Sequence, residues 1–429
     1  MMIKRMTALV TGALSITAIL AAGLQAQAQE ARSYAAIPSE KGGQDPFGGY
    51  VPQVGWPKPL SEIPGNEGWT FGAGQSVFAE SPDRVFYLQR GMLPDISRPR
   101  LTALTDIGPS LLYPPTAIWR NATQASLPSG GGTGSIAEDG VRAWIERGGR
   151  MGIDSKWEYN ILVFDREGNV IEAWTQWDSM LQRPHFVAIN PYDPEKHVWI
   201  VDDHKHVIHK FTNDGSTLLQ TIGTYGVPGA DETHFNRPTF MDWFPDSSFV
   251  VADGYNGTRV VKFDADGNYI TSWGERGTNG DETRPGYWNN VHGVAIDPQT
   301  NRIFVNDRGN RRIQVFDENG EYLYEWSIGD RLAGNVHLFY IGSDGFLWAA
   351  DRQTHKMLKY DLDGNFLYSW GSYGDYPGGI AGVHGISVDQ EGNVYLAQVD
   401  NKGGVQKFIP REGANPDFLL GLPVRSAWE

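Results

Sequence analysis

The chain is built from a repeating block of short strands, and this block limits the fold more than any other feature. One copy has an alternating apolar run at 292–296, a turn at 297–301, a second run at 302–307 and a third at 311–316. A fourth run follows an Asn-Gly turn and ends on Trp326. Period-two alternation bounded by Asp-Gly and Asn-Gly turns predicts antiparallel strands in meander order.

Each block starts with one position that we call the slot. The slot residues of five successive blocks are His185, Thr239, His292, His337 and His384. They recur 45 to 54 residues apart, which is the range of propeller blades and solenoids, and four strands per repeat favour a propeller. We therefore expect an all-β fold, a six-bladed β-propeller. Its first blade should begin near Gln75 and its last should end with a strand around 418–420.

The predicted domain organisation has four parts. A basic start and an apolar stretch precede Ala26-Gln27-Ala28, which predicts a signal peptide at 1–28, although an uncleaved anchor is the alternative. We expect an extended tail at 29–68 and one propeller at 69–429. An insert at 94–157 separates strands two and three of the first blade, and its segment 135–147 has a plausible helix start and would suit a lid. The mature protein is then secreted or periplasmic.

Composition narrows the class of partner. The formal net charge of -15 argues against nucleic acid or an anionic membrane, because both require a basic face. The chain has no cysteine, so disulfides are not part of its stability. No phosphate loop, His-Glu-x-x-His helix or Gly-x-Ser-x-Gly motif occurs in it. We expect a monomer that acts on a small molecule or peptide.

Several recurring polar and aromatic residues have structural interpretations. Aspartates that end the second strand are expected to staple the blades, with Gln89 and Gln398 near that place in the first and last blades. These are Asp202, Asp253, Asp307 and Asp351. Tryptophans that end the fourth strand are expected to be packing residues, namely Trp174, Trp273, Trp326 and Trp370. We assign Arg352 to a blade-to-blade salt bridge, and expect His204, His206 and His209 to be exposed.

Propeller geometry places the slot residues together at one channel mouth. The first strand of a blade lines the channel, and the second strand ends where the first begins. Residues that follow strand two, such as Arg90, Tyr255 and Arg308, should share this mouth with the slots. Three slot histidines stand in alternate blades, about 120° apart, as a tetrahedral ion with an open fourth position requires. The predicted metal ligands are His185, His292 and His384, and His337 is a predicted substrate contact.

These residues carry a resemblance to a known family. Val251–Asn256 is similar to an Asp-Gly-Tyr segment, Asn306–Gln314 to an Asp-Arg segment, and Tyr87–Gly91 to a first-blade Arg-Gly segment. With the spaced histidines, the chain resembles the NHL-repeat six-bladed propellers of the peptidyl-α-hydroxyglycine α-amidating lyase type over about residues 70 to 425.

The resemblance implies a zinc-dependent carbon–nitrogen lyase. It would cleave a carbinolamide to an amide and a glyoxylate-type aldehyde, with Tyr255 as the catalytic base and Arg90 and Arg308 beside the reacting centre and the substrate carboxylate. The family also has a structural calcium held by an aspartate after the third metal histidine. Gly385 stands there, so the sequence does not predict that calcium.

Two other functions stay open at this point. A non-catalytic NHL scaffold would bind protein or peptide on its open face. A metal-dependent hydrolase would use the same ion to activate water. The substrate of a lyase also stays open between an α-hydroxyglycine peptide and another hydroxylated amide.

Overall fold

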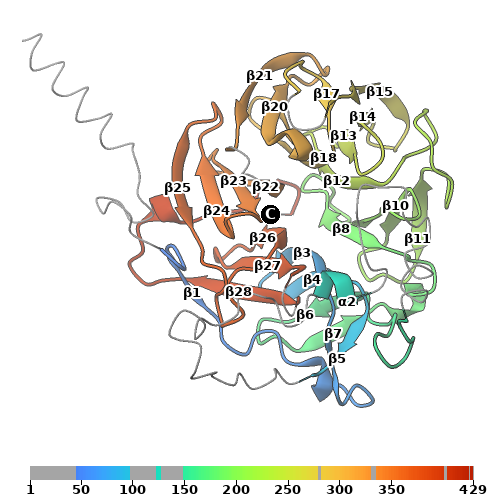
Figure 1. Ribbon diagram of the computed structural model, residues 1–429, viewed down its shortest axis with the longest axis vertical. Coiled ribbons are helices and arrows are strands. Elements are labelled where there is room, and N and C mark those ends of the chain that lie inside the picture. The colour runs from blue at the N-terminus through green and yellow to red at the C-terminus, as the bar shows by residue number, and fades with distance from the viewer. Residues whose placement is uncertain are drawn as a thin grey trace, which may run out of the picture.

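The computed structural model describes residues 45–96, 122–126, 148–278, 282–329, 335–400, 403–424 and 426–428. The predicted signal peptide at 1–28 and the helix start at 135–147 lie outside these residues. Within the described residues the chain forms six four-stranded antiparallel sheets, arranged around a central axis with the first strand of each sheet innermost (Figure 1). The predicted all-β, six-bladed propeller is confirmed.

The first three blades follow in chain order. Blade 1 contains β3 (Gly74–Ser81), β4 (Arg84–Gln89), β6 (Ile161–Phe164) and β7 (Val170–Ala173). Blade 2 contains β8 (Pro184–Ile189), β9 (Val198–Asp202), β10 (Val207–Phe211) and β11 (Leu218–Ile222). Blade 3 contains β12 (Pro238–Trp243), β13 (Phe249–Asp253), β14 (Arg259–Phe263) and β15 (Tyr269–Trp273).

The last three blades repeat the same order, except for the final strand. Blade 4 contains β18 (Val291–Ile296), β19 (Ile303–Asp307), β20 (Arg312–Phe316) and β21 (Tyr322–Ser327). Blade 5 contains β22 (Val336–Ile341), β23 (Leu347–Asp351), β24 (Lys356–Tyr360) and β25 (Phe366–Trp370). Blade 6 contains β26 (Val383–Val388), β27 (Val394–Gln398), β28 (Val405–Pro410) and β1 (Tyr50–Pro52).

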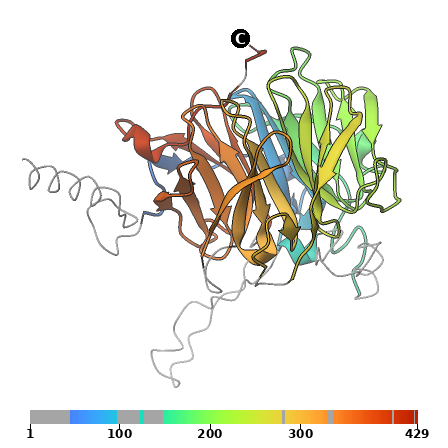
Figure 2. The same ribbon diagram turned by 90° about the horizontal axis from the view of Figure 1, so that it is seen from above.

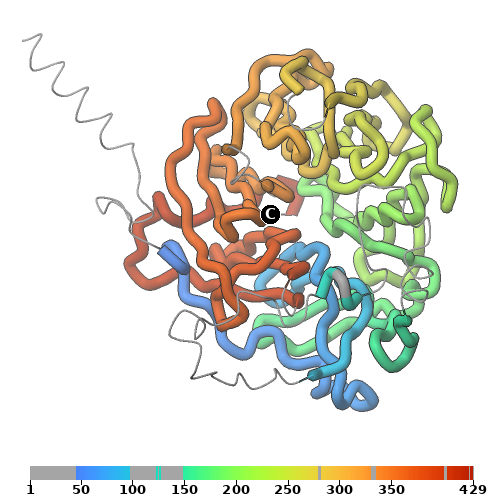
Figure 3. The backbone as a smooth tube through the Cα atoms, viewed as in Figure 1, coloured from blue at the N-terminus to red at the C-terminus, as the bar shows by residue number. Residues whose placement is uncertain are grey.

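The ring is closed by a strand from the N-terminal side of the chain. β1 pairs antiparallel with β28, so the first described segment of the chain lies beside the last strands (Figure 3). The expected closing strand around 418–420 is wrong, because that segment holds the short 3₁₀ helix η6 (Pro416–Phe418). The expected tail at 29–68 is therefore partly structural. An N-terminal outer strand closes the ring by hydrogen bonding its two ends together.

Several short helices and two short strand pairs lie outside the six four-stranded sheets. Besides η6, the described residues contain the 3₁₀ helices η1 (Leu60–Glu62), η4 (Thr175–Trp177) and η5 (Arg308–Asn310). Two short pairs are β2 (Trp69–Phe71) with β5 (Met92–Pro94), and β16 (Glu275–Arg276) with β17 (Tyr287–Trp288). The helix α2 (Ala122–Ala125) belongs to the insert and lies on the opposite face from the C-terminus (Figure 2). In the described part of the chain no helix is both long and apolar enough to cross a bilayer.

The repeated aspartates and tryptophans have the structural roles that the sequence predicts. The Asp253 carboxylate accepts hydrogen bonds from the Asn236 backbone N–H and from Nε of Arg259. Gln398 replaces an aspartate in blade 6 and accepts from the Ala381 N–H. Trp273 lies against the turn glycine Gly320 of the next blade, where a Cβ atom would come within 2.8 Å of the indole. Adjacent blades are thus fixed to each other by stapled turns and stacked indoles.

A β-bulge marks the slot in every blade. The register between the first two strands shifts at Gly74/Ser76, Pro184/Phe186, Pro238/Met241, Val291/Val294, Val336/Phe339 and Val383/Gly385. A bulge leaves one residue unpaired and redirects its side chain. The bulges therefore explain how the slot side chains depart from the in–out alternation of the strand and point toward the channel axis.

Candidate metal centre and the surrounding arginines

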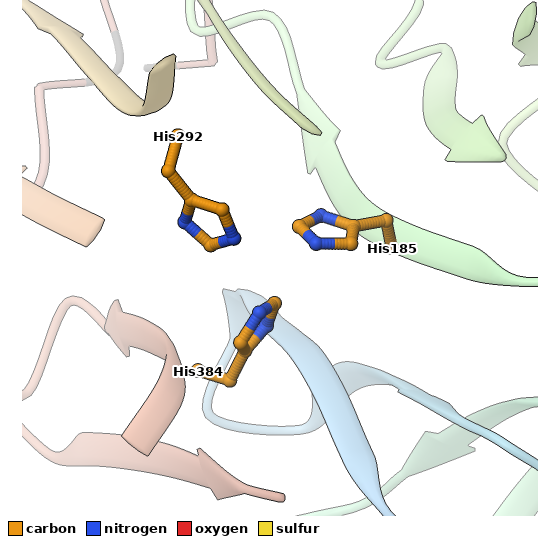
Figure 4. Close-up of side chains that lie close together, drawn as sticks. All are labelled: His185, His292 and His384. Carbon is orange, nitrogen blue, oxygen red and sulfur yellow. The ribbon is translucent and has the colours of Figure 1, made fainter. Parts of the chain in front are cut away.

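Three slot histidines converge at one end of the channel. One ring nitrogen from each of His185, His292 and His384 lies within 4.8 Å of the others, and the three rings point toward a common centre (Figure 4). The side chains are 0%, 0% and 3% exposed. The predicted ligand triangle therefore exists as a buried group of three imidazoles, and such a group can hold a metal ion.

Backbone carbonyls of neighbouring blades fix the orientation of these rings. Nδ1 of His185 donates to the carbonyl oxygen of Thr239 at 3.0 Å, and Nδ1 of His384 donates to that of Gln75 at 2.8 Å. Nδ1 of His292 donates to the carbonyl oxygen of His337 at 2.6 Å. Because a carbonyl can only accept, each Nδ1 carries the proton and each Nε2 has a free lone pair. Metal-ligating histidines are held in this way.

Burial keeps these imidazoles neutral. It lowers the pKa of His185 and of His292 well below the usual histidine range, and repulsion from neighbouring cationic groups adds to the shift. Burial also lowers the pKa of His384, to about 3. At neutral pH all three Nε2 atoms are therefore lone-pair donors, the form that a transition metal binds.

Tyr255 lies beside the histidines and adds a hydroxyl oxygen to the atoms that could bind a cation. Its hydroxyl oxygen lies 3.0 Å from Nε2 of His185 and 3.0 Å from Nε2 of His292. The hydroxyl has one proton and can satisfy only one of these two acceptors. A bound metal ion would satisfy the remaining lone pairs, so the residues present fit the ion that the three-histidine pattern implies.

The floor of the site is aromatic. The Phe240 ring lies 5.1 Å from the His185 ring, 5.2 Å from that of His292 and 5.6 Å from that of His384, measured between centroids. Beyond it is a cavity of about 160 Å³ whose lining includes Met241, Leu338 and Trp428. This cavity lies under the C-terminal segment, away from the histidines. Phe240 thus separates the histidine group from the apolar part of the channel.

His337 stands beside the triangle without belonging to it. Its ring lies 5.6 Å from the His292 ring and 5.2 Å from the His384 ring. Its Nδ1 donates to the carbonyl oxygen of Val383 at 3.1 Å, so its Nε2 is also an acceptor. The side chain is 2% exposed. His337 therefore offers a fourth buried acceptor on the blade-5 side of the site.

Arg90 and Arg308 lie at the same mouth, as the sequence predicts for their positions. Arg90 is 1% exposed; burial and repulsion from Arg183 lower its pKa to about 9, while attraction to Tyr255 opposes the shift. The Arg308 guanidinium lies 5.4 Å from the centroid of the Tyr255 ring. Burial lowers the pKa of Arg308 and its interaction with Tyr255 raises it. Arg308 therefore lies against the tyrosine ring, and Arg90 is a buried cation of the same mouth.

Arg352 forms an ion pair with Asp400 of blade 6, with Nε 2.6 Å from the carboxylate. The predicted blade-to-blade salt bridge is confirmed.

Gly385 leaves no room for the aspartate that the resemblance would place there. A Cβ atom at this position would lie 2.8 Å from the backbone of Ser76 and Val77 in the first strand of blade 1.

The sequence interpretation missed four residues of the mouth. Arg183, Asp203, His204 and Arg237 are all buried, with exposures of 4%, 0%, 7% and 6%. The expected exposure of His204, His206 and His209 is wrong, because they are 7%, 8% and 1% exposed. The signal that was available is an Arg-Pro pair directly before the slots of blades 2 and 3, at 183–184 and 237–238.

Fold and site together define a six-bladed β-propeller with three converging histidines at one end of its channel. Comparisons with known proteins identify the family of the chain. The chain is 32% identical to human NHL repeat-containing protein 3 over 278 residues, covering 60% of this chain and 75% of that protein. It therefore belongs to the NHL-repeat family. No family model matches the chain.

Other relatives carry amidating-lyase names. The probable peptidyl-α-hydroxyglycine α-amidating lyase of Caenorhabditis elegans is 24% identical over 249 residues, 56% of this chain and 67% of that protein. Peptidyl-glycine α-amidating monooxygenase of Mus musculus is 32% identical over 164 residues, 37% of this chain. The match spans only 16% of that mouse protein. A streptogramin B lyase structure matches with a TM-score of 0.44 and 12% identity over 80% of this chain and 94% of that one.

Proposed function

We propose that the protein is a metal-dependent carbon–nitrogen lyase that cleaves a carboxylated carbinolamide to an amide and a glyoxylate-type aldehyde. Two findings support the proposal: relatives named as amidating lyases and a buried group of three histidines able to hold a metal ion. Zinc is the ion we propose for it, because three imidazoles with one open position are typical of catalytic zinc. When bound, the ion supplies Lewis acidity to the substrate hydroxyl.

The side chains of the mouth would bind and orient the substrate. Arg90 and Arg308 would hold the substrate carboxylate, since a guanidinium presents a planar fork of donors to a carboxylate. His337 would accept a hydrogen bond from the substrate on the blade-5 side, because its Nε2 carries a lone pair. Arg90 and His337 are 1% and 2% exposed, and this burial would keep bulk water from the reacting carbon.

Tyr255 would move the proton. As a phenolate it takes the proton of the carbinol hydroxyl, and the carbon–oxygen double bond forms as the carbon–nitrogen bond breaks. The electron pair of that bond leaves with the nitrogen, which then takes the proton back from the Tyr255 hydroxyl. The products are an amide and an aldehyde, and no water is consumed. This sequence requires one group that first accepts and then donates a proton.

The observation that carries the proposal is the position of the Tyr255 hydroxyl, 3.0 Å from Nε2 of two of the three histidines. At this position Tyr255 would be able to transfer a proton beside the candidate metal ion. We also propose that the N-terminal segment directs the protein to an extracytoplasmic compartment, on the residues of its predicted signal peptide.

The test is elemental analysis of wild type and His292→Ala, with glyoxylate release from an α-hydroxyglycine compound measured on both. We expect about one equivalent of metal and activity in wild type, and loss of both in the variant. His197→Ala is the control, because His197 lies in a turn before β9 and pairs with Asp193. Full activity in His292→Ala would refute the assignment. Release of an acid with consumption of water would indicate a hydrolase, and absence of metal binding would indicate a scaffold.

A further inference from the structure

A cluster of arginines surrounds the Tyr255 ring beyond the two that the proposed function uses. The guanidinium carbons of Arg183, Arg237 and Arg308 lie 5.1, 4.5 and 5.4 Å from the ring centroid. Arg183 and Arg237 directly precede the first strands of blades 2 and 3. We call these two residues the arginine pair.

The arginine pair shares a single carboxylate. Arg237 donates to Asp203 through Nη2 at 2.7 Å and through Nε at 3.0 Å. Nε of Arg183 lies 3.4 Å from the other oxygen of the same carboxylate. Although burial raises the pKa of Asp203, the two guanidiniums hold it well below the usual range. One carboxylate therefore balances only one of the two positive charges.

Arg183 has donors without an acceptor, because its buried Nε makes no hydrogen bond within the described residues. Its Nη1 lies 3.3 Å from Nε2 of His204, and burial keeps the pKa of that histidine well below its usual range. His204 is thus a neutral acceptor and adds no charge. In the part of the chain that the structure describes, Nη2 of Arg183 has no hydrogen-bond acceptor. A guanidinium that is 4% exposed with unmet donors is costly unless a ligand completes it.

This positive charge is local, because the chain as a whole has a net charge of -15. Repulsion within the mouth is also visible in Arg90, since Arg183 contributes to lowering its pKa. A substrate with one carboxylate would balance one of the two positive charges of Arg90 and Arg308, and the charge of Arg183 would remain. Cations held together against their own repulsion indicate complementarity to a second negative charge.

We propose that the substrate carries a second acidic group on its acyl side, and that the arginine pair binds it. The substrate class is then an N-acyl-α-hydroxyglycine whose acyl chain ends in a carboxylate. The inference rests on the proposed lyase function and adds the acyl-side specificity to it. Arg183 is the specificity-determining residue, and Asp203 orients Arg237 beside it.

The experiment compares two substrates of equal length. N-succinyl-α-hydroxyglycine has the terminal carboxylate, and N-succinamoyl-α-hydroxyglycine has a neutral amide in its place. We expect kcat/KM for the acid to exceed that for the amide by about 10- to 100-fold, as a charge-assisted hydrogen bond to a buried group provides. Equal kcat/KM values for the two compounds would overturn the proposal.

Variants of Arg183 distinguish a role in binding the second acidic group of the substrate from a role in positioning Tyr255. Arg183→Gln should lower kcat/KM for the acid at least tenfold more than kcat/KM for the amide, and Arg183→Lys should keep part of the preference. Arg166→Gln is the matched control, because Arg166 forms exposed ion pairs with Asp83 and Glu391. If Arg183→Gln lowers kcat/KM equally for both compounds, Arg183 only positions Tyr255 and the proposal is wrong.

A binding measurement distinguishes this inference from the proposed function. Glutarate and butyrate are titrated calorimetrically into wild type and Arg183→Gln. We expect wild type to bind glutarate at least tenfold more tightly than butyrate, and the variant to bind them alike. If neither α-hydroxyglycine substrate is cleaved but glutarate binds more tightly than butyrate, the proposed lyase function is wrong and the site for a second anion is supported. If glutarate is not preferred, the anion site fails whatever the outcome of the cleavage assay.

Discussion

Nδ1 of His292 donates a 2.6 Å hydrogen bond to the carbonyl oxygen of His337, the slot residue of the next blade. His185 and His384 make the equivalent bond to slot residues of their own neighbours. The neighbour of His384 is Gln75 in blade 1, on the other side of the ring closure. The orientation of the His384 lone pair therefore depends on a closed ring, and those of His185 and His292 depend on the next blade along the chain.

Tyr255→Phe tests the proton-transfer role. The variant keeps the aromatic ring among its three guanidiniums and loses only the hydroxyl, so we expect it to fold and to retain its metal. Its kcat for glyoxylate release should fall about 10²- to 10⁴-fold, the usual contribution of a general acid–base group. Metal content and kcat are measured on the same preparation. Unchanged kcat would exclude Tyr255 from the chemistry, and loss of the metal would make it a ligand.

His337→Asn tests the proposed substrate contact. His337 lies outside the group of three possible ligands, so we expect the variant to retain about one equivalent of metal. Loss of one hydrogen bond to substrate should raise KM by about tenfold. His292→Asn, assayed in parallel, should lose the metal. A His337→Asn protein without metal would instead identify His337 as a ligand.

His209 makes stability depend on pH. Burial lowers its pKa to about 4, below the value of about 6.5 in an unfolded chain. The folded protein then binds fewer protons than the unfolded chain, so this contribution to stability is present above pH 6.5 and is lost as pH falls toward 4. Between these pH values the loss is about 3 kcal/mol.

The measurement for His209 is the free energy of unfolding in urea at several pH values, for wild type and His209→Leu. Leucine does not titrate, so the stability of wild type relative to the variant should decrease as pH falls through this range. Other titrating groups cancel in the difference. Parallel pH profiles for the two proteins would show that His209 is free to protonate in the folded state.

Tyr50→Ala tests the ring closure by β1. Tyr50 is 1% exposed, packs against Trp370 and accepts a hydrogen bond from the Leu420 N–H. Removing this side chain should cost about 3–5 kcal/mol of unfolding free energy, as for other large buried aromatics. Val51 on the same strand is 50% exposed, and Val51→Thr should change stability by less than about 0.5 kcal/mol. Equal effects of the two changes would mean that β1 contributes little to the closure.

Much of the architecture follows from the repeat alone. Period-two alternation and the turn residues predict four strands per block, and the aspartate that ends the second strand predicts the stapled turns seen at Asp253. The slot spacing predicts that His185, His292 and His384 share one channel mouth. These features are local or strictly periodic, so sequence order alone carries them.

Tertiary contacts decided which strand closes the ring and which charged residues line the channel mouth. The repeat pattern predicts a closing strand at 418–420, whereas Tyr50–Pro52 occupies that place, because ring closure pairs segments from opposite ends of the chain. It also missed Arg183, Arg237 and Asp203. The ion pair of Arg237 with Asp203 crosses from blade 3 to blade 2, and nothing in the spacing of a single repeat encodes a contact between repeats.

The sequence by itself determined the strands, their repetition and the identity of the residues at each slot. Only the tertiary structure decided that bulges redirect the slot side chains to the axis and that carbonyls of the adjacent blade fix the protonated nitrogen of each imidazole. The physical reason is that alternation and turn chemistry act over a few residues. The direction of a lone pair depends instead on a backbone carbonyl 54, 45 or 309 residues away, which the packing of adjacent blades and the closure of the ring bring close.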